Sequence, residues 1–345
     1  MNELKLPKDT KSIKEKISED IKARKEEQER LIAESRAKFY GSLSALGFFS
    51  EERRSKGKKF VADFYDRHLG LKKESSRGKS FLETPFEKIL RNRYQNDVEK
   101  QAKLMNFMAR VRNDAGLLII EDEDFARRFI QTNEFEAAIL SVDIRRSTEL
   151  MLRCESSEVY SEFISHLLEG LTDSVKEYYG IYDKFTGDGF LAFFPDFFSG
   201  RENLLNAMLC AMDCQRIFDE IFDEYKKFFE LKQVTTGLGA GIDYGCVYKA
   251  GAEMEYSVIG KPVVYACRFS AAPSGHLYLT KNAFDKFLTL NRNEMKITQT
   301  KIEIKHEEAQ TAFDVTLNNP GALYEIKTAL PDWKEKLEKM NKDEK

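Results

Sequence analysis

The feature that most constrains the fold is a run of apolar residues with an acidic residue near its end. Residues 134–144 read EFEAAILSVDI, and the middle of this run is almost continuously apolar. Such continuity is typical of a strand in the centre of a sheet rather than of a strand with one solvated face. The run therefore predicts a central strand over 134–144, with Asp143 at its end.

The segments that follow this strand alternate between helix-like and strand-like patterns. We expect a helix over 157–180 closed by Gly180, a GDG hairpin over 181–194 and a helix over roughly 201–230. Strands over 234–243 and 246–250 should follow around a DYG turn, and EYSVIGKPVVYACRFSAA should form a strand, a turn and a helix. The chain should end with strands over 276–280, 297–305 and 322–328 and a charged helix over 331–343. The order β-α-ββ-α-ββ-α-β indicates an α+β sandwich with a mostly antiparallel sheet and helices on one face.

Composition divides the chain into three parts. Residues 1–115 form a predicted helical extension without visible chemistry, with helices expected over 11–37 and 85–112. The first of these carries only a thin apolar stripe, which suits either a dimerising helix or a solvated arm. Residues 116–330 form the main domain, and residues 331–345 form the charged C-terminal helix or tail.

Bulk properties exclude several classes of protein. A net charge of −3 on 345 residues provides no global basic field for nucleic acid. The charged first residues do not form a signal peptide, and no apolar run is long enough to span a membrane. The five cysteines lack a CxxC pair, which fits reduced and mostly buried thiols. We therefore expect a soluble, cytoplasmic protein that binds neither nucleic acid nor membrane.

Two aspartates stand where strands end. Asp143 is followed by a turn into a helix, and Asp188 lies in the hairpin that would pair beside that strand. Taken singly, Asp143 suits a helix N-cap and the GDG suits a plain hairpin tip. Together, two carboxylates on adjacent strands can hold two divalent ions for in-line phosphoryl transfer. The pair therefore favours a metal site.

Four segments carry a family resemblance. AAILSVDIRRSTELM, YDKFTGDGFLAFF, GLGAGIDYGCVYKAG and EYSVIGKPVVYACRFSAA resemble, in order and spacing, the class III nucleotidyl cyclase domain over roughly residues 130–330. The resemblance implies a palm-like α+β fold and a homodimer with active sites at its interface. It also implies a reaction that turns a nucleoside triphosphate into its 3′,5′-cyclic monophosphate and pyrophosphate, with two Mn²⁺ or Mg²⁺ ions per site.

The same resemblance assigns residues to roles. The metal ligands would be Asp143, Asp188 and the backbone carbonyl of Ile144, and the turn that binds the triphosphate would include Arg145, Ser147 and Thr148. Lys184 and Ser257 would face the base, with Phe185 at the wall of the pocket. Arg268 would stabilise the reacting phosphate. The alternatives are a solvated Lys184, a structural ion pair for Arg268 and a plain strand hydroxyl for Ser257.

Two departures from the family pattern stand out. Val264 occupies the position of the asparagine that orients the ribose, and the turn that usually reads Gly-Asp-Thr or Gly-Asn-Thr is GKP over 260–262. A catalytically silent, nucleotide-binding regulatory module is therefore the alternative from a different functional class. Pyrophosphate release in the presence of Mn²⁺ separates the two.

The remaining expectation concerns the base. Guanylate cyclases carry Glu and Cys at the positions of Lys184 and Ser257, so guanylate is disfavoured. The chain most resembles the pyrimidine cyclases of Pycsar anti-phage systems, whose cyclic UMP or cyclic CMP activates a separate effector protein. A lysine only donates hydrogen bonds, which suits O4 of uracil rather than the amino group of cytosine. Together with the bulky Phe185, Val264 and Tyr265, this predicts UTP, with CTP and ATP as alternatives.

Overall fold

The computed structural model describes residues 107–230, 236–250, 256–304 and 308–343. The helix expected over 11–37 lies outside these residues, as does most of the one expected over 85–112. The described end of the latter is helical only at residues 107–108 and continues as a turn at 109–110, so the helix ends before residue 112. Among the described residues, every helix is too short or too polar to cross a membrane.

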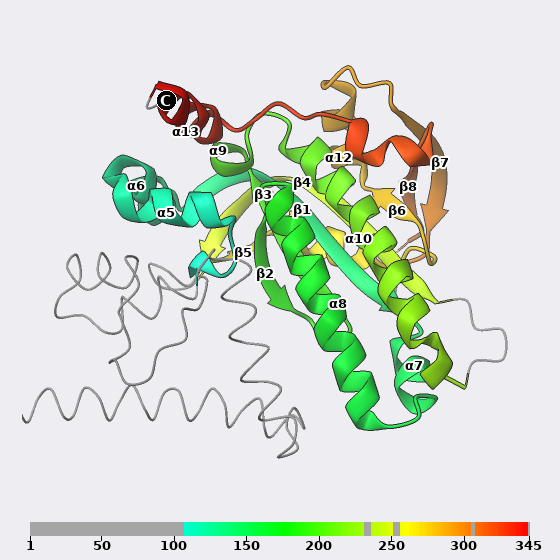
Figure 1. The fold of residues 1–345 in the computed structure, drawn as a ribbon. Helices are drawn as coiled ribbons and strands as arrows, with labels where there is room; N and C mark the ends of the chain where they lie inside the picture. The colour runs from blue at the N-terminus through cyan, green and yellow to red at the C-terminus, as the bar shows by residue number, and fades with distance from the viewer. Residues whose placement is uncertain (1–106, 231–235, 251–255, 305–307, 344–345) are drawn as a thin grey trace, which may run out of the picture. The chain divides into compact units, whose positions relative to one another are not determined.

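The chain forms helices and strands in alternation (Figure 1). The α-helices are α5 (Asn113–Glu121), α6 (Glu123–Gln131), α7 (Ser147–Leu152), α8 (Ser157–Glu177), α9 (Asp196–Ser199), α10 (Asn203–Tyr225), α11 (Lys261–Phe269), α12 (Lys281–Leu288) and α13 (Asp332–Asp343). The strands are β1 (Glu134–Arg145), β2 (Ile181–Phe185), β3 (Gly189–Pro195), β4 (Gly237–Ala250), β5 (Ser257–Ile259), β6 (Leu277–Leu279), β7 (Met295–Ile302) and β8 (Gln310–Leu317). Short 3₁₀ helices cover Lys226–Phe228 and Pro320–Glu325.

The described strands form one sheet in the order β2-β3-β1-β4-β6-β8-β7, with β5 paired to β4. β1 pairs antiparallel with β3 on one side and with β4 on the other. β4 and β6 run parallel, and the other described pairings are antiparallel. The expected α+β class with a mostly antiparallel sheet is confirmed, and β1 is the central strand that its apolar run predicts.

Both faces of the sheet are covered, so the expectation of helices on one face is wrong. Leu140 and Val142 of β1 pack with α8 and α10, which run side by side across one face (Figure 1). Ile139 of the same strand faces the other way and packs with α5, α6 and α11. A strand that is apolar on both sides requires this second cover, since burying only one face would leave the other in water.

The second face is built from aromatic rings, and we call it the aromatic face. It comprises Phe107, Phe125, Phe129, Phe193, Phe198, Tyr256 and Trp333. The rings of Phe193 and Tyr256 stack with centroids 6.1 Å apart, and those of Phe198 and Trp333 stack at 5.5 Å. Trp333 Nε1 also donates a hydrogen bond of 2.8 Å to the carbonyl of Phe198. Each ring pair contributes about 0.5–1.5 kcal/mol beyond area burial.

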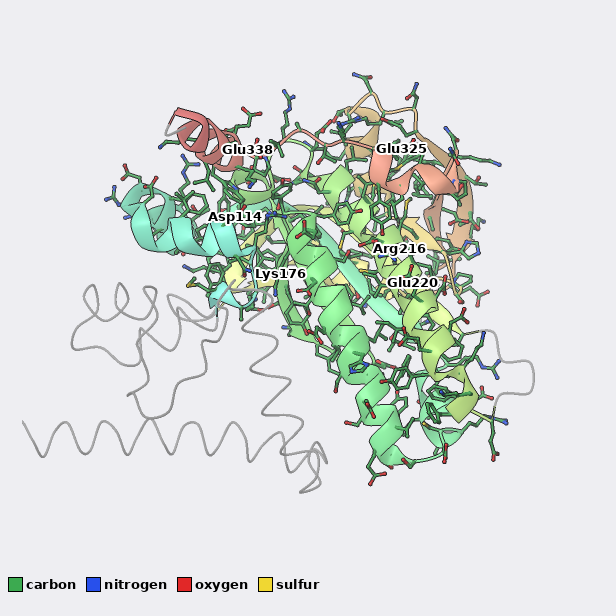
Figure 2. The ribbon with its side chains drawn as sticks, in the orientation of Figure 1. Asp114, Lys176, Arg216, Glu220, Glu325 and Glu338 are labelled. Atoms are coloured by element: carbon green, nitrogen blue, oxygen red, sulfur yellow. The ribbon has the colours of Figure 1, made fainter. Side chains whose placement is uncertain are left out.

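Ion pairs on the surface connect helices to one another or cross one helical turn. Asp114 of α5, labelled in Figure 2, accepts a hydrogen bond of 2.7 Å from Lys334 of α13. Arg216 and Glu220, also labelled there, pair one turn apart on α10. The first pair joins α5 to α13 on the aromatic face, whereas exposed pairs within one helix add only about 0.3–0.5 kcal/mol.

Two expected elements differ from the structure, and two observed elements were not expected. No turn interrupts β4 at DYG, because β1 keeps pairing with β4 from Gly237 to Tyr248. Residues 322–328, expected as a strand, begin as a 3₁₀ helix, and the last antiparallel strand is the unexpected β8. Helix α12 was also not expected. The helix over 331–343 is confirmed by α13.

Gly180 does not close α8 in the expected way. The residue with positive φ is Tyr179, at 60°, and Gly180 follows it. The amide of Gly180 donates to the carbonyl of Val175, and the amide of Tyr179 donates to that of Lys176, which is a Schellman ending. The glycine is needed for space, because a Cβ there would lie 2.7 Å from the ring of Phe194.

The cysteines carry free thiols, as expected from their spacing. Their burial differs from the expectation: Cys210 and Cys214 are buried, Cys154 and Cys246 are half-buried, and Cys267 is exposed.

Candidate active site

The β2–β3 hairpin is fixed against the end of β1. Asp143 lies opposite Gly189 in the ladder, and the amide of Ile144 donates a hydrogen bond of 2.9 Å to the carbonyl of Asp188. The hairpin is closed by Thr186, whose amide donates to the carbonyl of Gly189 at 2.8 Å. The chain thus places Asp188, at the tip of the hairpin, beside the strand that carries Asp143.

The two glycines of the hairpin tip have different structural roles. Gly187 has a φ of 101°, and a Cβ there would meet nothing within 4 Å, so this residue provides the left-handed turn. At Gly189 a Cβ would lie 2.0 Å from the carbonyl oxygen of Val142. Gly189 therefore allows the close approach of β3 to β1 that brings Asp188 beside Asp143, and the left-handed residue precedes the aspartate instead of following it.

The carboxylates already have polar partners in the chain. The guanidinium of Arg145 pairs with Asp143 Oδ2, and Ser147 Oγ donates a hydrogen bond of 2.7 Å to Asp188 Oδ2. Burial lowers the pKa of Arg145, and the nearby charge of Asp188 acts in the opposite direction. We call Asp143, Arg145, Ser147 and Asp188 the acidic cluster.

The turn after β1 is shorter than the sequence suggests. Arg145 is still a strand residue, paired with Gly237, and Arg146 makes the turn in a left-handed conformation with a φ of 62°. Ser147 and the exposed Thr148 begin α7. The N-cap of α7 is Arg146, so the alternative of Asp143 as a helix cap is wrong.

A second polar group surrounds Lys184. Lys184 Nζ donates to Ser257 Oγ at 3.5 Å, and Ser257 Oγ donates to Asp183 Oδ2 at 2.9 Å. The side chain of Asp183 is only 2% exposed, and its burial raises the pKa of that carboxyl, while the hydrogen bond from Ser257 and the charge of Arg110 oppose the rise. The resemblance predicts Lys184 and Ser257 as partners, and the structure brings them together.

Arg110 completes this group and was not expected from the sequence. Its Nη2 lies 3.1 Å from Asp183 Oδ1 and also donates to the carbonyl of Tyr256, while its Nε donates to the carbonyl of Tyr182 at 2.5 Å. We call Arg110, Asp183, Lys184 and Ser257 the lysine cluster. No local pattern marks Arg110, because its partners lie 72 to 146 residues away.

The remaining predicted residues lie on β2 and α11. Arg268 is in the last turn of α11, and its guanidinium carbon lies 5.8 Å from the ring centroid of Tyr265. Val264 on the same helix is 47% exposed, and Phe185 at the end of β2 is 37% exposed. In this single chain, the acidic cluster and the lysine cluster share no hydrogen bond or ion pair among the described residues.

The acidic cluster fits divalent ions. Carboxylate, hydroxyl and carbonyl oxygens are the ligands that Mg²⁺ and Mn²⁺ prefer, and Mg²⁺ sites often use one or two carboxylates completed by substrate phosphates. No group of three acidic, histidine or cysteine side chains gathers among the described residues, so two aspartates are what this site offers. The ion pair of Arg145 with Asp143 shows that a positive charge is accommodated beside this carboxylate.

Comparison with known proteins gives structural matches only, since neither a family model nor a curated protein matches the chain. The adenylyl cyclase CyaB from P. aeruginosa is 19% identical with a TM-score of 0.47, covering 54% of this chain and 96% of that one. The guanylyl cyclase Cya2 is 20% identical with a TM-score of 0.46, covering 55% and 95%. The guanylate cyclase domain of RhGC from Catenaria anguillulae, in complex with GTP, is 16% identical with a TM-score of 0.42, covering 55% and 100%.

Proposed function

We propose that this chain is a class III nucleotidyl cyclase that converts UTP into cyclic UMP and pyrophosphate. The observation that carries the proposal is the acidic cluster: two carboxylates on neighbouring strands, with a cationic side chain and a hydroxyl already bound to them. This is the arrangement that the sequence motifs require for two-ion phosphoryl transfer.

The reaction forms one bond to phosphorus and breaks another. The ribose 3′ hydroxyl transfers its proton to solvent water, its oxygen forms a bond to the α-phosphorus, and the bond from the α-phosphorus to the bridging oxygen breaks to release pyrophosphate. Divalent ions supply charge neutralisation at the attacking and leaving oxygens when bound. Asp143, Asp188 and the carbonyl of Ile144 would hold them.

The chain's own residues would bind and orient the rest of the substrate. Arg145, Ser147 and Thr148 stand at the start of α7, where amide groups can meet the triphosphate. Arg268 would stabilise charge on the reacting phosphate, as preorganised cations do in such sites. Phe185, exposed at the end of β2, would form the wall beside the base.

We further propose that the active chain is a homodimer whose sites combine the acidic cluster of one protomer with the lysine cluster and Arg268 of its partner. Within one chain the two clusters share no hydrogen bond or ion pair among the described residues. The apolar side chains of Ile259 on β5 and Val264 on α11 are exposed and suit coverage by a second copy. Two-fold symmetry then creates two equivalent sites.

The base assignment follows from Lys184. Its side chain is 57% exposed, so its ammonium group is accessible to a ligand while it also contacts Ser257. A donor at this place fits O4 of uracil and leaves the amino group of cytosine unpaired, a mismatch that can cost a factor of about 10⁴. Cyclic CMP and cyclic AMP are the alternative products.

The biological role rests on the resemblance to pyrimidine cyclases of anti-phage systems. The cyclic nucleotide would act as a second messenger for a separate effector protein in bacterial antiviral defence, and the chain itself would be cytoplasmic. The silent regulatory module remains the competing proposal, because Val264 places no polar atom where the family orients the ribose.

The test incubates the purified chain with ATP, GTP, CTP and UTP separately in the presence of Mn²⁺, followed by chromatographic identification of products and a pyrophosphate assay. We expect cyclic UMP from UTP. Cyclic AMP as the main product would refute the pyrimidine assignment, and cyclic CMP would overturn the role given to Lys184. Nucleotide binding without pyrophosphate release would establish the silent module instead.

A further inference from the structure

The lysine cluster contains a residue that no role yet explains. Arg110 lies before α5, in the segment that sequence patterns leave without chemistry, yet its guanidinium contacts Tyr182 and Asp183 of the hairpin and the carbonyl of Tyr256. Its backbone takes part as well, because the amide of Tyr182 donates a hydrogen bond of 3.1 Å to the carbonyl of Arg110.

The contacts of Arg110 converge on the strand ends that carry the base-facing residues. On β2 its Nε binds the carbonyl of Tyr182, two residues before Lys184. Before β5 its Nη2 binds the carbonyl of Tyr256, which directly precedes Ser257. The guanidinium therefore bridges two strands that do not pair with each other, since β2 pairs with β3 and β5 pairs with β4.

The third contact of Arg110 determines the hydrogen bonding of Ser257. Arg110 Nη2 approaches Asp183 Oδ1, which leaves Oδ2 to accept the hydroxyl hydrogen of Ser257. With that hydrogen committed, the oxygen of Ser257 can only accept, and Lys184 Nζ donates to it. One guanidinium thus sets the acceptor character of Ser257 and the direction of Lys184.

We propose that Arg110 is a positioning residue that determines base selectivity through Asp183, Ser257 and Lys184. The inference rests on the proposed function only in taking Lys184 and Ser257 as the residues that face the base. Arg110 itself does not touch the substrate. It holds the two side chains in the register in which they present one donor and one acceptor to the edge of a base.

An Arg110–Asp183 ion pair that served stability alone would respond to mutation differently from one that positions Ser257 and Lys184. Replacing both members of a buried ion pair by apolar residues of similar volume is often neutral or stabilising, whereas removing one member leaves an uncompensated charge. If Arg110 and Asp183 served stability alone, the double replacement would therefore restore the protein fully. A positioning role predicts that stability returns while base selectivity does not.

The experiment compares the wild-type chain with Arg110→Met, Arg110→Lys and the double variant Arg110→Met/Asp183→Leu. The matched control is Arg112→Met, which removes an arginine two residues away that pairs with Asp114 and Glu177 instead. For each protein, the binding constants of the four nucleoside triphosphates are measured by calorimetry, turnover is measured in competition assays with equal nucleotide concentrations, and thermal unfolding is recorded.

We expect Arg110→Met to lower the preference for the best base by about 10²-fold, the order of effect of a misplacement near 1 Å. Arg110→Lys retains the charge without the fork and recovers only part of the preference. The double variant regains the unfolding temperature but not the preference, and Arg112→Met retains the preference. Wild-type preference in a folded Arg110→Met or double variant would overturn the inference.

The two proposals fail in different ways. A wild-type chain that binds nucleotides selectively without cyclising them would refute the cyclase and leave the role of Arg110 testable by binding alone. A wild-type chain that cyclises one nucleotide, with an Arg110→Met variant of equal selectivity, would refute only the role of Arg110. Absence of binding by all four nucleotides would refute both.

Discussion

The acidic cluster and the lysine cluster differ in how their members are brought together. The acidic cluster draws on the end of β1, the first residue of α7 and the tip of the adjacent hairpin, and its side-chain hydrogen bond joins residues 41 positions apart. The lysine cluster draws on a segment before α5, on β2 and on β5, and its contacts join residues 73 to 146 positions apart. One cluster is formed by neighbouring strands, and the other is formed across strands that do not pair.

The difference also appears in exposure. Asp143 and Arg145 retain 24% and 27% of their side-chain exposure, which leaves room for ions and phosphate. Asp183 is almost completely buried beneath Lys184, so the polar support of the lysine cluster is hidden and only its tip is accessible. A site that exchanges ions must stay open, whereas a site that discriminates between bases benefits from a rigid underlying network.

The largest expected effect is a loss of turnover when one carboxylate of the acidic cluster is removed. Asp188→Asn keeps the size of the side chain but removes an anionic ligand, which should lower turnover by about 10³-fold, the equivalent of several kcal/mol of transition-state stabilisation. Cyclic nucleotide formation measures the effect, and unfolding temperatures check the fold. Asp285→Asn, on the exposed surface of α12, is the control. Substantial turnover by Asp188→Asn would end the two-ion assignment.

A mixing experiment tests whether the two clusters belong to different protomers of one site. Asp143→Asn and Arg268→Ala should each be inactive, but half of the dimers after random exchange are heterodimers with one intact site. The mixture should therefore recover about one quarter of wild-type activity, since one of two sites works in half of the dimers. Subunit exchange is verified with two affinity tags. No recovery despite exchange would place both clusters in sites within one protomer.

The pairing of Arg145 with Asp143 leads to a smaller effect, on ion binding. The guanidinium is a positive charge beside the carboxylate that would hold the ion, so Arg145→Met should tighten Mn²⁺ binding by about tenfold, or 1.4 kcal/mol. Electron paramagnetic resonance titration without nucleotide measures the affinity directly. Arg153→Met, whose arginine pairs with Glu149, serves as the control. If Arg145→Met binds Mn²⁺ with the same affinity as the wild-type chain, the guanidinium does not compete with the ion for the carboxylates.

The smallest expected effect concerns the pH dependence of the lysine cluster. Burial raises the pKa of Asp183, whose neighbours are Arg110, Lys184, Ser257 and Tyr182. Acidification protonates this carboxyl at a pH above its usual 3.8, which removes the negative charge that strengthens its hydrogen bonds from Ser257 and Arg110, so base selectivity should decline severalfold.

The stability of the fold should respond in the opposite direction. A carboxyl whose pKa is raised on folding favours the folded state at low pH, and that contribution is lost as pH rises through the raised pKa. Product ratios and unfolding free energies measured across the acidic range distinguish the two trends. Asp183→Asn, which lacks the titration, should show a flat selectivity profile, and a sloping one would assign the effect to another group.

The sequence predicts the acidic cluster better than the lysine cluster for a physical reason. Asp143 lies near the end of β1 and Asp188 directly precedes β3, both strands have visible apolar runs, and antiparallel pairing then brings the two residues together. Lys184 and Ser257 were paired through a family resemblance, and Arg110 could not be found because its partners are set by tertiary packing. Tertiary pairing also explains why the turn predicted at Asp-Tyr-Gly is wrong. This tripeptide is typical of a turn, but the pairing of β4 with β1 continues through it.

The fold itself was predicted in class and in most elements up to α11. Before β6 the errors are the turn expected inside β4 and the short helices α5, α6 and α9, and after β6 the elements α12 and β8 have weak local patterns. The apolar run of β1 indicates that both faces of the sheet are covered. The helices that cover the second face are amphipathic, and their sequence pattern does not tell which face of the sheet they pack against.

Trp333 bears on the time course of folding during synthesis. It stacks on Phe198, which precedes it by 135 residues, and it also contacts the rings of Phe125 and Tyr179. A nascent chain that has just produced β5 and α11 already contains every proposed catalytic residue, but its aromatic face still lacks this ring. Contacts of such long range form late, because their loop closure must wait for synthesis. Helix α13 must therefore be synthesised before the aromatic face is complete, whereas the residues of both clusters are already present once β5 has been made.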